Sequence, residues 1–495
     1  MNKIGFDNDK YLTLQTEFIR RRIETFGDKL YLEFGGKLFD DFHASRVLPG
    51  FAPDSKLQML LKMKDEAEIV IVINSDAIEQ CKMRGDLGIT YDMDVLRLID
   101  AFREVGLYVG SVCLTQFADQ KLAKQFERTL KKLDIRTYRH YPIKGYPYDV
   151  DGIVSESGLG KNEYIETSRR LIVVTAPGPG SGKMATCISQ LYHDNKRGVK
   201  SGYAKFETFP VWNLPLKHMV NVAYEAATAD LNDVNMIDPY HLEAYGVSTV
   251  NYNRDVEIFP VLNRLFQKIY GEEIYKSPTD MGVNMAGNCI IDDAVCVEAS
   301  RQEIVRRYFA ALVDRRNDKA TDGVVAKLEL LMQQNEISVS IRKAVSAARE
   351  KEAKTGEPAC AVELNDGTIV TGKTSRLLGA VSAMLLNALK MLAGIDDKVM
   401  LLSPGLIEPI QRLKTVHLGG HNPRLHSDEI LIALSISAVT NPVAALAMQS
   451  LSLLKGAECH STVNLSQVDV NVLKKLGVNY TADPIYQTKK LYHAK

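Results

Sequence analysis

The segment from Thr175 to Met184 holds residue types that can bind a phosphate group. It reads TAPGPGSGKM and directly follows Leu171–Val174, an apolar run typical of a buried strand. Glycines permit backbone angles that turn several N–H groups toward one anion, and a lysine adds positive charge. We therefore expect a phosphate-binding loop between this strand and a helix that begins near Ser181.

The loop departs from the nucleotide-binding pattern G-x-x-x-x-G-K-[ST] at two positions. Pro177 stands at the first glycine position, and Met184 replaces the hydroxyl residue that would bind magnesium. Lys183 is predicted to act catalytically by neutralising charge on phosphate oxygens, and Thr186 is a candidate magnesium ligand. The alternative is a glycine-rich turn that binds no ligand. The predicted cofactor-binding residues of the loop are Gly178, Gly180, Ser181, Gly182, Lys183 and Thr186.

A second segment, residues 367–374, matches the same pattern letter by letter. It reads GTIVTGKT, but its four consecutive β-branched residues favour a strand over a turning loop. The preceding Asn365-Asp366-Gly367 is a hairpin signal. The sequence therefore predicts the second strand of a hairpin, with Gly372 opening the next helix. Lys373 and Thr374 stay candidate cofactor-binding residues, because a helix N-terminus beside them can hold an anion.

Two carboxylates are candidates for chemistry on a bound phosphate. Asp76 follows the apolar run Ile69–Ile73, and a carboxylate at the end of a strand beside a phosphate loop often binds Mg²⁺. The alternative for Asp76 is an ordinary helix cap. Asp280 lies in a stretch of small and polar residues, 277–288, which reads either as an active-site loop or as a long surface turn. We predict a catalytic role for Asp280.

The sequence argues against zinc chemistry. Tyr240–Glu243 contains H-x-E, but the P-C-x-x-C half of the zinc deaminase signature does not occur. The segment His417–His426 holds three histidines without a ligand spacing such as H-E-x-x-H. It is interpreted as a polar loop, with anion contact through Arg424 as an alternative. We therefore expect no zinc.

These candidate residues need a scaffold, and the first part of the chain alternates strand and helix patterns. Apolar residues recur at helical spacing over Val95–Phe102 and again over Leu122–Leu130. This rhythm indicates an α/β fold with a parallel sheet covered by helices. We predict a P-loop-like α/β domain over residues 1–212. The apolar runs that predict its buried strands are 69–73, 107–114 and 171–174.

The remaining sequence predicts two further domains. Residues 213–345 are expected to form a mixed, mainly helical domain, because helical periods appear around Ile304–Leu312 and Val324–Leu331. Residues 346–495 are expected to form a C-terminal α/β domain, with the charged stretch 348–358 as a linker. Its expected elements are a hairpin over 360–370, a helix over 377–392 and strands near 399–402, 461–465 and 478–481.

The composition limits the classes of binding partner and the cellular location that we expect. Lys plus Arg and Asp plus Glu each number 61 in 495 residues, and this zero net charge argues against a duplex nucleic acid as partner. Seven widely spaced cysteines without C-x-x-C predict reduced thiols and a cytoplasmic location. The stretch Ile430–Leu454 has no charged residue, but Asn441-Pro442 is a helix start. We therefore expect two buried helices there and no membrane span.

Three of these segments together resemble one bacterial protein family. They are PGPGSGKMAT at 177–186, SPTDMGVNMAG at 277–287 and TGKTS at 371–375, and they are similar to the family known as domain of unknown function 1846. The segments lie in all three predicted domains, so the resemblance covers essentially the whole chain. It implies a cytosolic protein. Some members are labelled ATP-dependent peptidases, but this sequence carries no peptidase signature. The order of hairpin and helix after Ala361 is also similar to the topology of the cytidine deaminase superfold.

The leading hypothesis is a cytosolic protein that binds a small phosphorylated ligand, first of all ATP or another nucleotide with Mg²⁺. Such a protein would be an NTP-dependent phosphotransferase or an NTP hydrolase. The missing hydroxyl residue after Lys183 favours an alternative, an ATP-independent enzyme acting on a sugar phosphate or nucleotide at a domain interface. A third possibility is a non-catalytic oligomeric ligand sensor. We expect a homo-oligomer, because uncharged apolar helices can pack between subunits.

Overall fold

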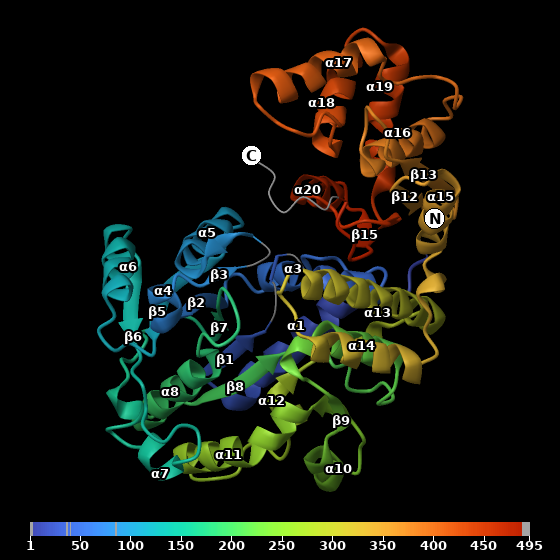
Figure 1. Ribbon diagram of the computed structural model, residues 1–495. Helices are drawn as coiled ribbons and strands as arrows, with labels where there is room; N and C mark the ends of the chain where they lie inside the picture. The colour runs from blue at the N-terminus through green and yellow to red at the C-terminus, as the bar shows by residue number, and fades with distance from the viewer. Residues whose placement is uncertain (1–2, 36–37, 40, 85–86, 488–495) are drawn as a thin grey trace. The chain divides into compact units, whose positions relative to one another are not determined.

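The computed structural model describes residues 3–35, 38–39, 41–84 and 87–487 (Figure 1). They form two compact units, which we describe separately. The sheet unit consists of Ile4–Glu225 and Asn232–Ala299. The C-terminal unit consists mainly of the chain from Ser300 onward, with Ala226–Leu231.

The sheet unit is built on seven parallel strands in the order β11-β8-β1-β7-β2-β5-β6. The β-branched run Ile69–Ile73 forms the middle of β2 and is at most 1% exposed, as burial on both faces requires. The predicted parallel α/β sheet is therefore confirmed. Its strands are β1 (Lys29–Phe34), β2 (Ala67–Asn74), β5 (Tyr108–Thr115), β6 (Arg136–Arg139), β7 (Leu171–Thr175), β8 (Ser201–Phe206) and β11 (Gly282–Val283).

Helices cover the sheet, and one face packs on α8 and α11. Val70 and Ile172 of the sheet share a buried core with Leu191 of α8 and Leu262 and Phe266 of α11. The helices of this unit are α1 (Asn8–Phe26), α2 (Phe42–Val47), α3 (Ser55–Lys62), α4 (Ser75–Glu79), α5 (Tyr91–Glu104), α6 (Lys121–Lys132), α7 (Val150–Ile153), α8 (Lys183–Lys196), α9 (Met219–Ala227), α10 (Pro239–Tyr245), α11 (Asn253–Tyr270) and α12 (Pro278–Met281). Its short strands are β3 (Met83–Arg84), β4 (Ile89–Thr90), β9 (Asn235–Ile237) and β10 (Val250–Tyr252).

The strand order creates a topological switch point between β1 and β7. The chain passes from β1 to β2 in one direction along the sheet and from β7 to β8 in the other. Right-handed crossovers in opposite directions place their helices on opposite faces of a sheet. Ligands of open parallel sheets bind at such a switch point, outside the carboxyl ends of the strands. The loop that follows β7 lies at this position.

The C-terminal unit holds a four-stranded sheet in the order β13-β12-β14-β15. β12 pairs antiparallel with β13 and with β14, and β14 pairs parallel with β15. The predicted hairpin is confirmed, since β12 and β13 flank the Asn365-Asp366-Gly367 turn. The elements are α13 (Asp293–Arg316), α14 (Asp322–Gln334), α15 (Lys343–Thr355), β12 (Ala359–Glu363), β13 (Ile369–Lys373), α16 (Ala380–Leu392), α17 (Pro404–Arg412), α18 (Ser427–Ser437), α19 (Pro442–Gln449), β14 (Glu458–Ser461), α20 (Gln467–Lys475) and β15 (Asn479–Ala482).

Three local predictions for this unit are wrong. The charged stretch 348–358 is no linker, because α15 continues through it to Thr355 and buries Ala344, Val345 and Ala348. Residues 399–402 form no strand, although Leu401 and Leu402 are buried. Gly372 does not open a helix: it lies inside β13, and α16 begins at Ala380.

The two helices predicted to meet at Asn441 are present as α18 and α19, but the prediction that they are buried is only half right, since each buries one face and exposes the other. The side chain of Asn441 accepts hydrogen bonds from the N–H groups of Val443 and Ala444, which caps α19 as the sequence predicts. Among the described helices, none combines the length and the apolar character that crossing a membrane requires. From the stretch predicted to be a separate middle domain, Gly282–Val283 joins the large sheet as its edge strand β11.

Candidate functional site

The loop between β7 and α8 is built on glycines in left-handed conformations. Gly180 has φ 75° and Gly182 has φ 88°, and Gly182 is the N-cap of α8 without a capping side chain. Gly178 is required for a different reason, because a methyl group there would lie 2.3 Å from the hydroxyl of Tyr91. The predicted order of strand, turning loop and helix is confirmed. Backbone of this kind turns successive N–H groups toward a common point.

Neighbouring strand ends hold the carbonyl groups of this loop. The Asn74 amide at the end of β2 donates to the Gly180 carbonyl at 3.3 Å. The Thr115 hydroxyl at the end of β5 donates to the Ser181 carbonyl at 2.7 Å. In contrast, the N–H groups of residues 180–185 donate to no other group in the part of the chain that the structure describes. The acceptors of the loop are therefore engaged, whereas its donors stay available for a ligand.

Lys183 adds positive charge at the same place. It is the first residue of α8 and is half-buried, and its side chain makes no hydrogen bond or ion pair within the described ranges. A cation at a helix N-terminus is unfavourable by itself, because the N-terminal end of the helix dipole is positive. An anion bound between Lys183 and the free N–H groups would remove this repulsion.

The structure separates the two predicted magnesium ligands. Asp76 is exposed on α4, two residues beyond the Asn74 that contacts the loop, and its Oδ1 accepts a 2.8 Å hydrogen bond from Gln120. The predicted adjacency of its strand to the loop strand is confirmed, since β2 pairs with β7. Thr186 is fully buried, and its hydroxyl lies against the Cys113 thiol, whose pKa burial raises. Thr186 therefore faces the core beneath α8.

A small cavity opens beside the loop. Its volume is about 40 Å³, enough for about one water molecule. His140 in its wall is buried, which lowers the pKa of the imidazole to about 4, so the ring is neutral at pH 7. The lining residues are Thr115, Gln116, His140, Tyr141, Ile143, Tyr146, Asn162, Gly182 and Ala185. Sequence reasoning missed His140 and Tyr146, because nothing in their spacing relates them to residues 178–183.

A charged cluster lies at the carboxyl ends of β1 and β8. Lys205 is 2.8 Å from the Glu207 carboxylate and also pairs with Asp255, and the Tyr203 hydroxyl donates to Glu33 at 2.7 Å. Burial raises the pKa of Glu207 to about 7, against the opposing charge of Lys205. β8 is separated from β7 only by β1, so these two strands lie roughly 10 Å apart. The sequence signal that could have found it is charge directly at the end of an apolar strand.

The predicted catalytic Asp280 lies elsewhere on the sheet. It belongs to α12, just before β11, and β11 is three strand spacings from β7, roughly 14 Å. Its Oδ2 accepts hydrogen bonds from the Tyr245 hydroxyl at 2.8 Å and from the Lys276 N–H at 2.9 Å. Thr279 beside it donates to the buried Asp238 at 2.6 Å. The structure thus engages Asp280 in local contacts and does not bring it to the Lys183 loop.

In the second pattern match, which lies in the C-terminal unit, the N–H groups that follow the lysine are engaged. Lys373 is exposed at the end of β13, and the N–H groups of Thr374 and Ser375 donate to the carbonyls of Pro358 and Leu378 at 2.8 and 3.0 Å. Arg424, the candidate anion contact, donates to the Ser375 carbonyl at 2.9 Å. Among the described residues, no group of three or more His, Cys, Asp and Glu side chains could hold a metal ion.

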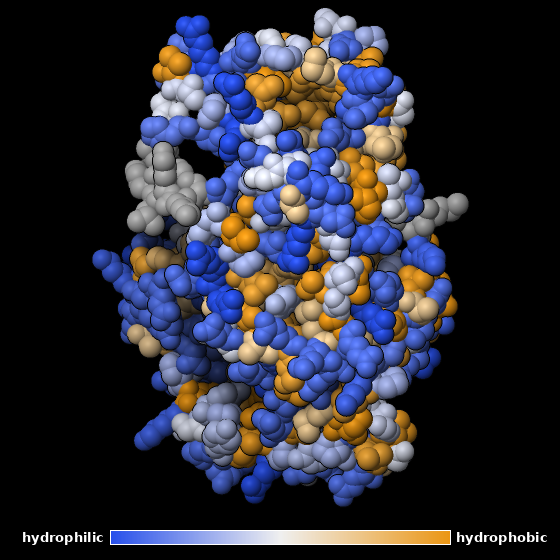
Figure 2. Space-filling view, turned by 45° about the vertical axis from the view of Figure 1, so that its right-hand side comes forward, coloured by the Kyte–Doolittle hydropathy of each residue, from blue (hydrophilic) through white to orange (hydrophobic). Residues whose placement is uncertain are grey.

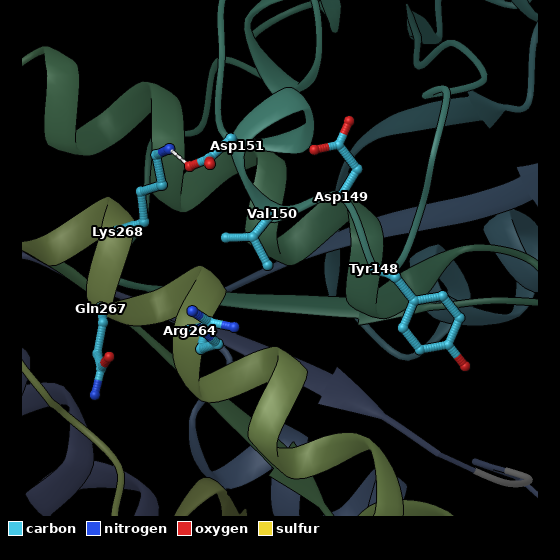
Figure 3. A pocket seen from close by; sticks show the side chains of 7 residues that line it. All are labelled: Tyr148, Asp149, Val150, Asp151, Arg264, Gln267 and Lys268. Carbon is cyan, nitrogen blue, oxygen red and sulfur yellow. Dashed lines mark hydrogen bonds and ion pairs between the residues drawn. The ribbon is translucent and has the colours of Figure 1, made fainter.

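A larger hollow of about 470 Å³ lies between α7 and α11 (Figure 3). Figure 3 shows its ion pair between Lys268 and Asp151. The Asp149 carboxylate caps α7 through the Gly152 N–H at 3.0 Å. The hollow is lined by Tyr148, Asp149, Val150, Asp151, Arg264, Gln267 and Lys268, so it contains none of the residues that the sequence predicts to be functional.

Comparison with known proteins covers essentially the whole chain. The family models described as "Domain of unknown function DUF1846, N-terminal" and "Domain of unknown function DUF1846, C-terminal" match residues 4–336 and 340–492. A UPF0371 protein of Streptococcus sanguinis (strain SK36) is 58% identical over 492 residues, which are 99% of this chain and 100% of that protein. A UPF0371 protein of Streptococcus equi subsp. equi (strain 4047) is 58% identical over 494 residues, 100% of both chains. These names state neither a ligand nor a reaction.

Proposed function

The chain belongs to the family described as domain of unknown function DUF1846, and we propose that it binds the phosphate group of a small ligand at the loop between β7 and α8. One observation carries this proposal. The N–H groups of residues 180–185 and the Lys183 side chain belong to the loop and helix N-terminus that follow β7, and they have no partner among the described residues. Such a concentration of unpaired donors at a helix N-terminus is a favourable site for an anion.

The roles of the individual residues follow from this geometry. Gly178, Gly180 and Gly182 shape the loop, and its N–H groups bind the phosphate oxygens. Lys183 neutralises their charge, which also lowers the barrier to any phosphoryl transfer that occurs there.

Two substrate classes fit this site. A nucleoside triphosphate with Mg²⁺ is supported by Asp76, an exposed carboxylate next to the loop. The ATP-independent alternative, a sugar phosphate or nucleotide, is supported by Met184 and by the burial of Thr186, since neither offers a hydroxyl to a metal at the loop. The geometry favours the second class, because the residue after the loop lysine is the usual magnesium ligand of NTP sites.

The proposal also includes two resemblances to known folds and a location in the cell. We infer a P-loop-like connection for β7, the loop and α8, and a deaminase-like topology for the β12–β13 hairpin followed by α16. A cytoplasmic location is supported by the seven widely spaced cysteines and the absence of a C-x-x-C motif from the sequence.

Ligand binding to the Lys183→Ala variant tests the proposal. The wild-type chain is screened by thermal shift with nucleotides and sugar phosphates, each with and without Mg²⁺, and the Kd of any stabilising ligand is measured by calorimetry. We expect Lys183→Ala to weaken binding about tenfold or more, since a charged hydrogen bond to phosphate is worth about 1.5–3 kcal/mol. A Kd that depends on Mg²⁺ would select the nucleoside triphosphate class.

Lys373→Ala is the matched control, because Lys373 is an exposed lysine in the segment that fits the pattern letter by letter. Its Kd should equal that of the wild-type chain. Binding that is unchanged in Lys183→Ala, or weakened only in Lys373→Ala, would contradict the proposed site.

A further inference from the structure

Helix α18 is apolar on both of its faces. Ile430 and Leu434 are fully buried in the core of the C-terminal unit. On the opposite face, Ile432 and Ile436 lie four residues apart and are 61% and 66% exposed, and Val439 in the turn that follows α18 is 83% exposed. Large apolar side chains gathered on the outward face of a helix mark a surface that binds a partner. The outer face of α18 therefore needs a partner surface.

The neighbouring elements extend this apolar surface. α18 packs directly on α19, and Leu446 of α19 and Leu453, seven residues further, are 46% and 51% exposed. Figure 2 shows hydrophobic side chains gathered near the top of the view, where Figure 1 places the labels α16 to α19. The large apolar side chains of this region that are at least 36% exposed are Val399, Met400, Leu406, Leu413, Val416, Leu418, Ile432, Ile436, Val439, Leu446 and Leu453. We call them the α17–α19 surface.

The size of the α17–α19 surface matches a stable protein interface. A side chain of this type buries roughly 60–120 Å² of apolar area when it is fully covered, so eleven that are on average somewhat more than half exposed present roughly 400–750 Å². A standard interface buries about 800 Å² on each partner, of which about 56–65% is apolar, so the apolar area of this surface is sufficient for one.

The charge pattern points to a second copy of this chain as the partner. In a two-fold interface the same surface of each copy meets the other, so a surface whose charges all have one sign would repel its copy. The stretch Ile430–Leu454 carries no charge, and the flanking α17 carries both signs, in Glu408 and Arg412. We propose that the α17–α19 surface is the interface through which two copies of this chain pair. This interface is independent of the phosphate site, which belongs to the sheet unit.

Light scattering on the full chain during size-exclusion chromatography tests the pairing. We expect the wild-type chain to have twice the mass of one chain at micromolar concentration. Ile436→Lys and Val439→Lys should each behave as a single chain, because a lysine on this face would have to be buried in the interface. Both side chains are exposed in one copy, so neither substitution should lower the melting temperature of the monomer.

Leu330→Lys is the matched control. Leu330 lies on α14 in the same unit, is 52% exposed and is outside the α17–α19 surface, so its variant should pair like the wild-type chain. A wild-type chain that is a single copy at every concentration would overturn the proposal, and would mean that this surface is covered within the chain or by another protein. Pairing that survives both Ile436→Lys and Val439→Lys would overturn it equally, since the dimer would then use another surface.

Discussion

Lys183 and Lys373 show how the surroundings of a lysine decide what it can bind. Both follow a glycine, but Lys183 begins α8 among successive N–H groups that are free among the described residues, whereas Lys373 is the last residue of strand β13. After Lys373 the corresponding N–H groups donate to carbonyls of the same unit. The segment that ends at Thr374 therefore matches the sequence pattern more closely, whereas the N–H groups beside Lys183 are more suitable for binding a phosphate.

His140 makes stability depend on pH next to the proposed site. Burial lowers the pKa of its imidazole from 6.5 to about 4, although a hydrogen bond with the Glu163 carbonyl opposes the shift. The unfolded chain therefore binds a proton at His140 at a higher pH than the folded chain does. This difference removes stability as the pH falls from 6.5 toward 4, and has no effect well above pH 6.5.

The variant His140→Gln isolates this contribution. Between pH 7 and pH 5, the free energy of unfolding of the wild-type chain should fall by about 2 kcal/mol more than that of the variant. Urea denaturation at the two pH values, followed by circular dichroism, measures the difference. An equal loss in both proteins would mean that His140 is protonated equally easily in the folded and unfolded chains.

At the scale of elements, Gly372 decides how α16 packs on β13. A methyl group at Gly372 would lie 2.1 Å from the backbone nitrogen of Met384, so the helix and the strand approach closely only with glycine there. This packing requirement accounts for the second glycine of the pattern match without a phosphate. The segment therefore matches the phosphate-loop pattern and also forms a strand, and its second glycine is required by the packing of α16 on β13.

The variant Gly372→Ala should consequently destabilise the C-terminal unit. We expect a loss of about 1–3 kcal/mol, because α16 must move away from β13 to accommodate the methyl group. Gly405→Ala is the control in the same unit, since its methyl group would meet its nearest atom, Ser403 Oγ, at 3.9 Å. Its stability should stay within about 0.5 kcal/mol of the wild-type value. Thermal unfolding of both variants checks this, and equal melting temperatures would contradict the close packing.

At the scale of the whole molecule, the chain is two compact units with separate cores. Chains of this kind often unfold in more than one step. The proposed phosphate loop belongs to the sheet unit, and the α17–α19 surface belongs to the C-terminal unit. The two proposals can therefore fail independently.

Calorimetry can separate the two units. A phosphorylated ligand should raise only the transition of the sheet unit, because a ligand stabilises the part of the chain that binds it. Gly372→Ala should lower the temperature of the second transition only, which would assign that transition to the C-terminal unit. A single transition that the ligand and the substitution both shift would show that the units unfold together.

Local sequence patterns by themselves determine many elements of this protein. Five β-branched residues predict the buried strand β2, and the Asn365-Asp366-Gly367 turn predicts the hairpin of β12 and β13. The glycines after Val174 predict the turning loop, and Asn441 predicts the start of α19. These features depend on neighbours in the chain, since backbone angles and helical spacing are local properties. The linker prediction at 348–358 overlooked a local preference, since Ala, Arg, Glu and Lys are strong helix formers and continue α15. At 399–402, burial of Leu401 and Leu402 in the core takes place without a strand.

Only the tertiary structure decided which residues meet. The strand order inserts β7 between β1 and β2, and this brings Asn74 and Thr115 to the loop and places β8, which carries Lys205, two strands from β7. It also engages Asp280 elsewhere and leaves the outer face of α18 exposed. These outcomes follow from pairings between residues far apart in the sequence, whose energies come from burial and from long-range hydrogen bonds. No local pattern encodes such pairings, so the chemistry of single residues was predictable from the sequence, but their assembly into a site was not.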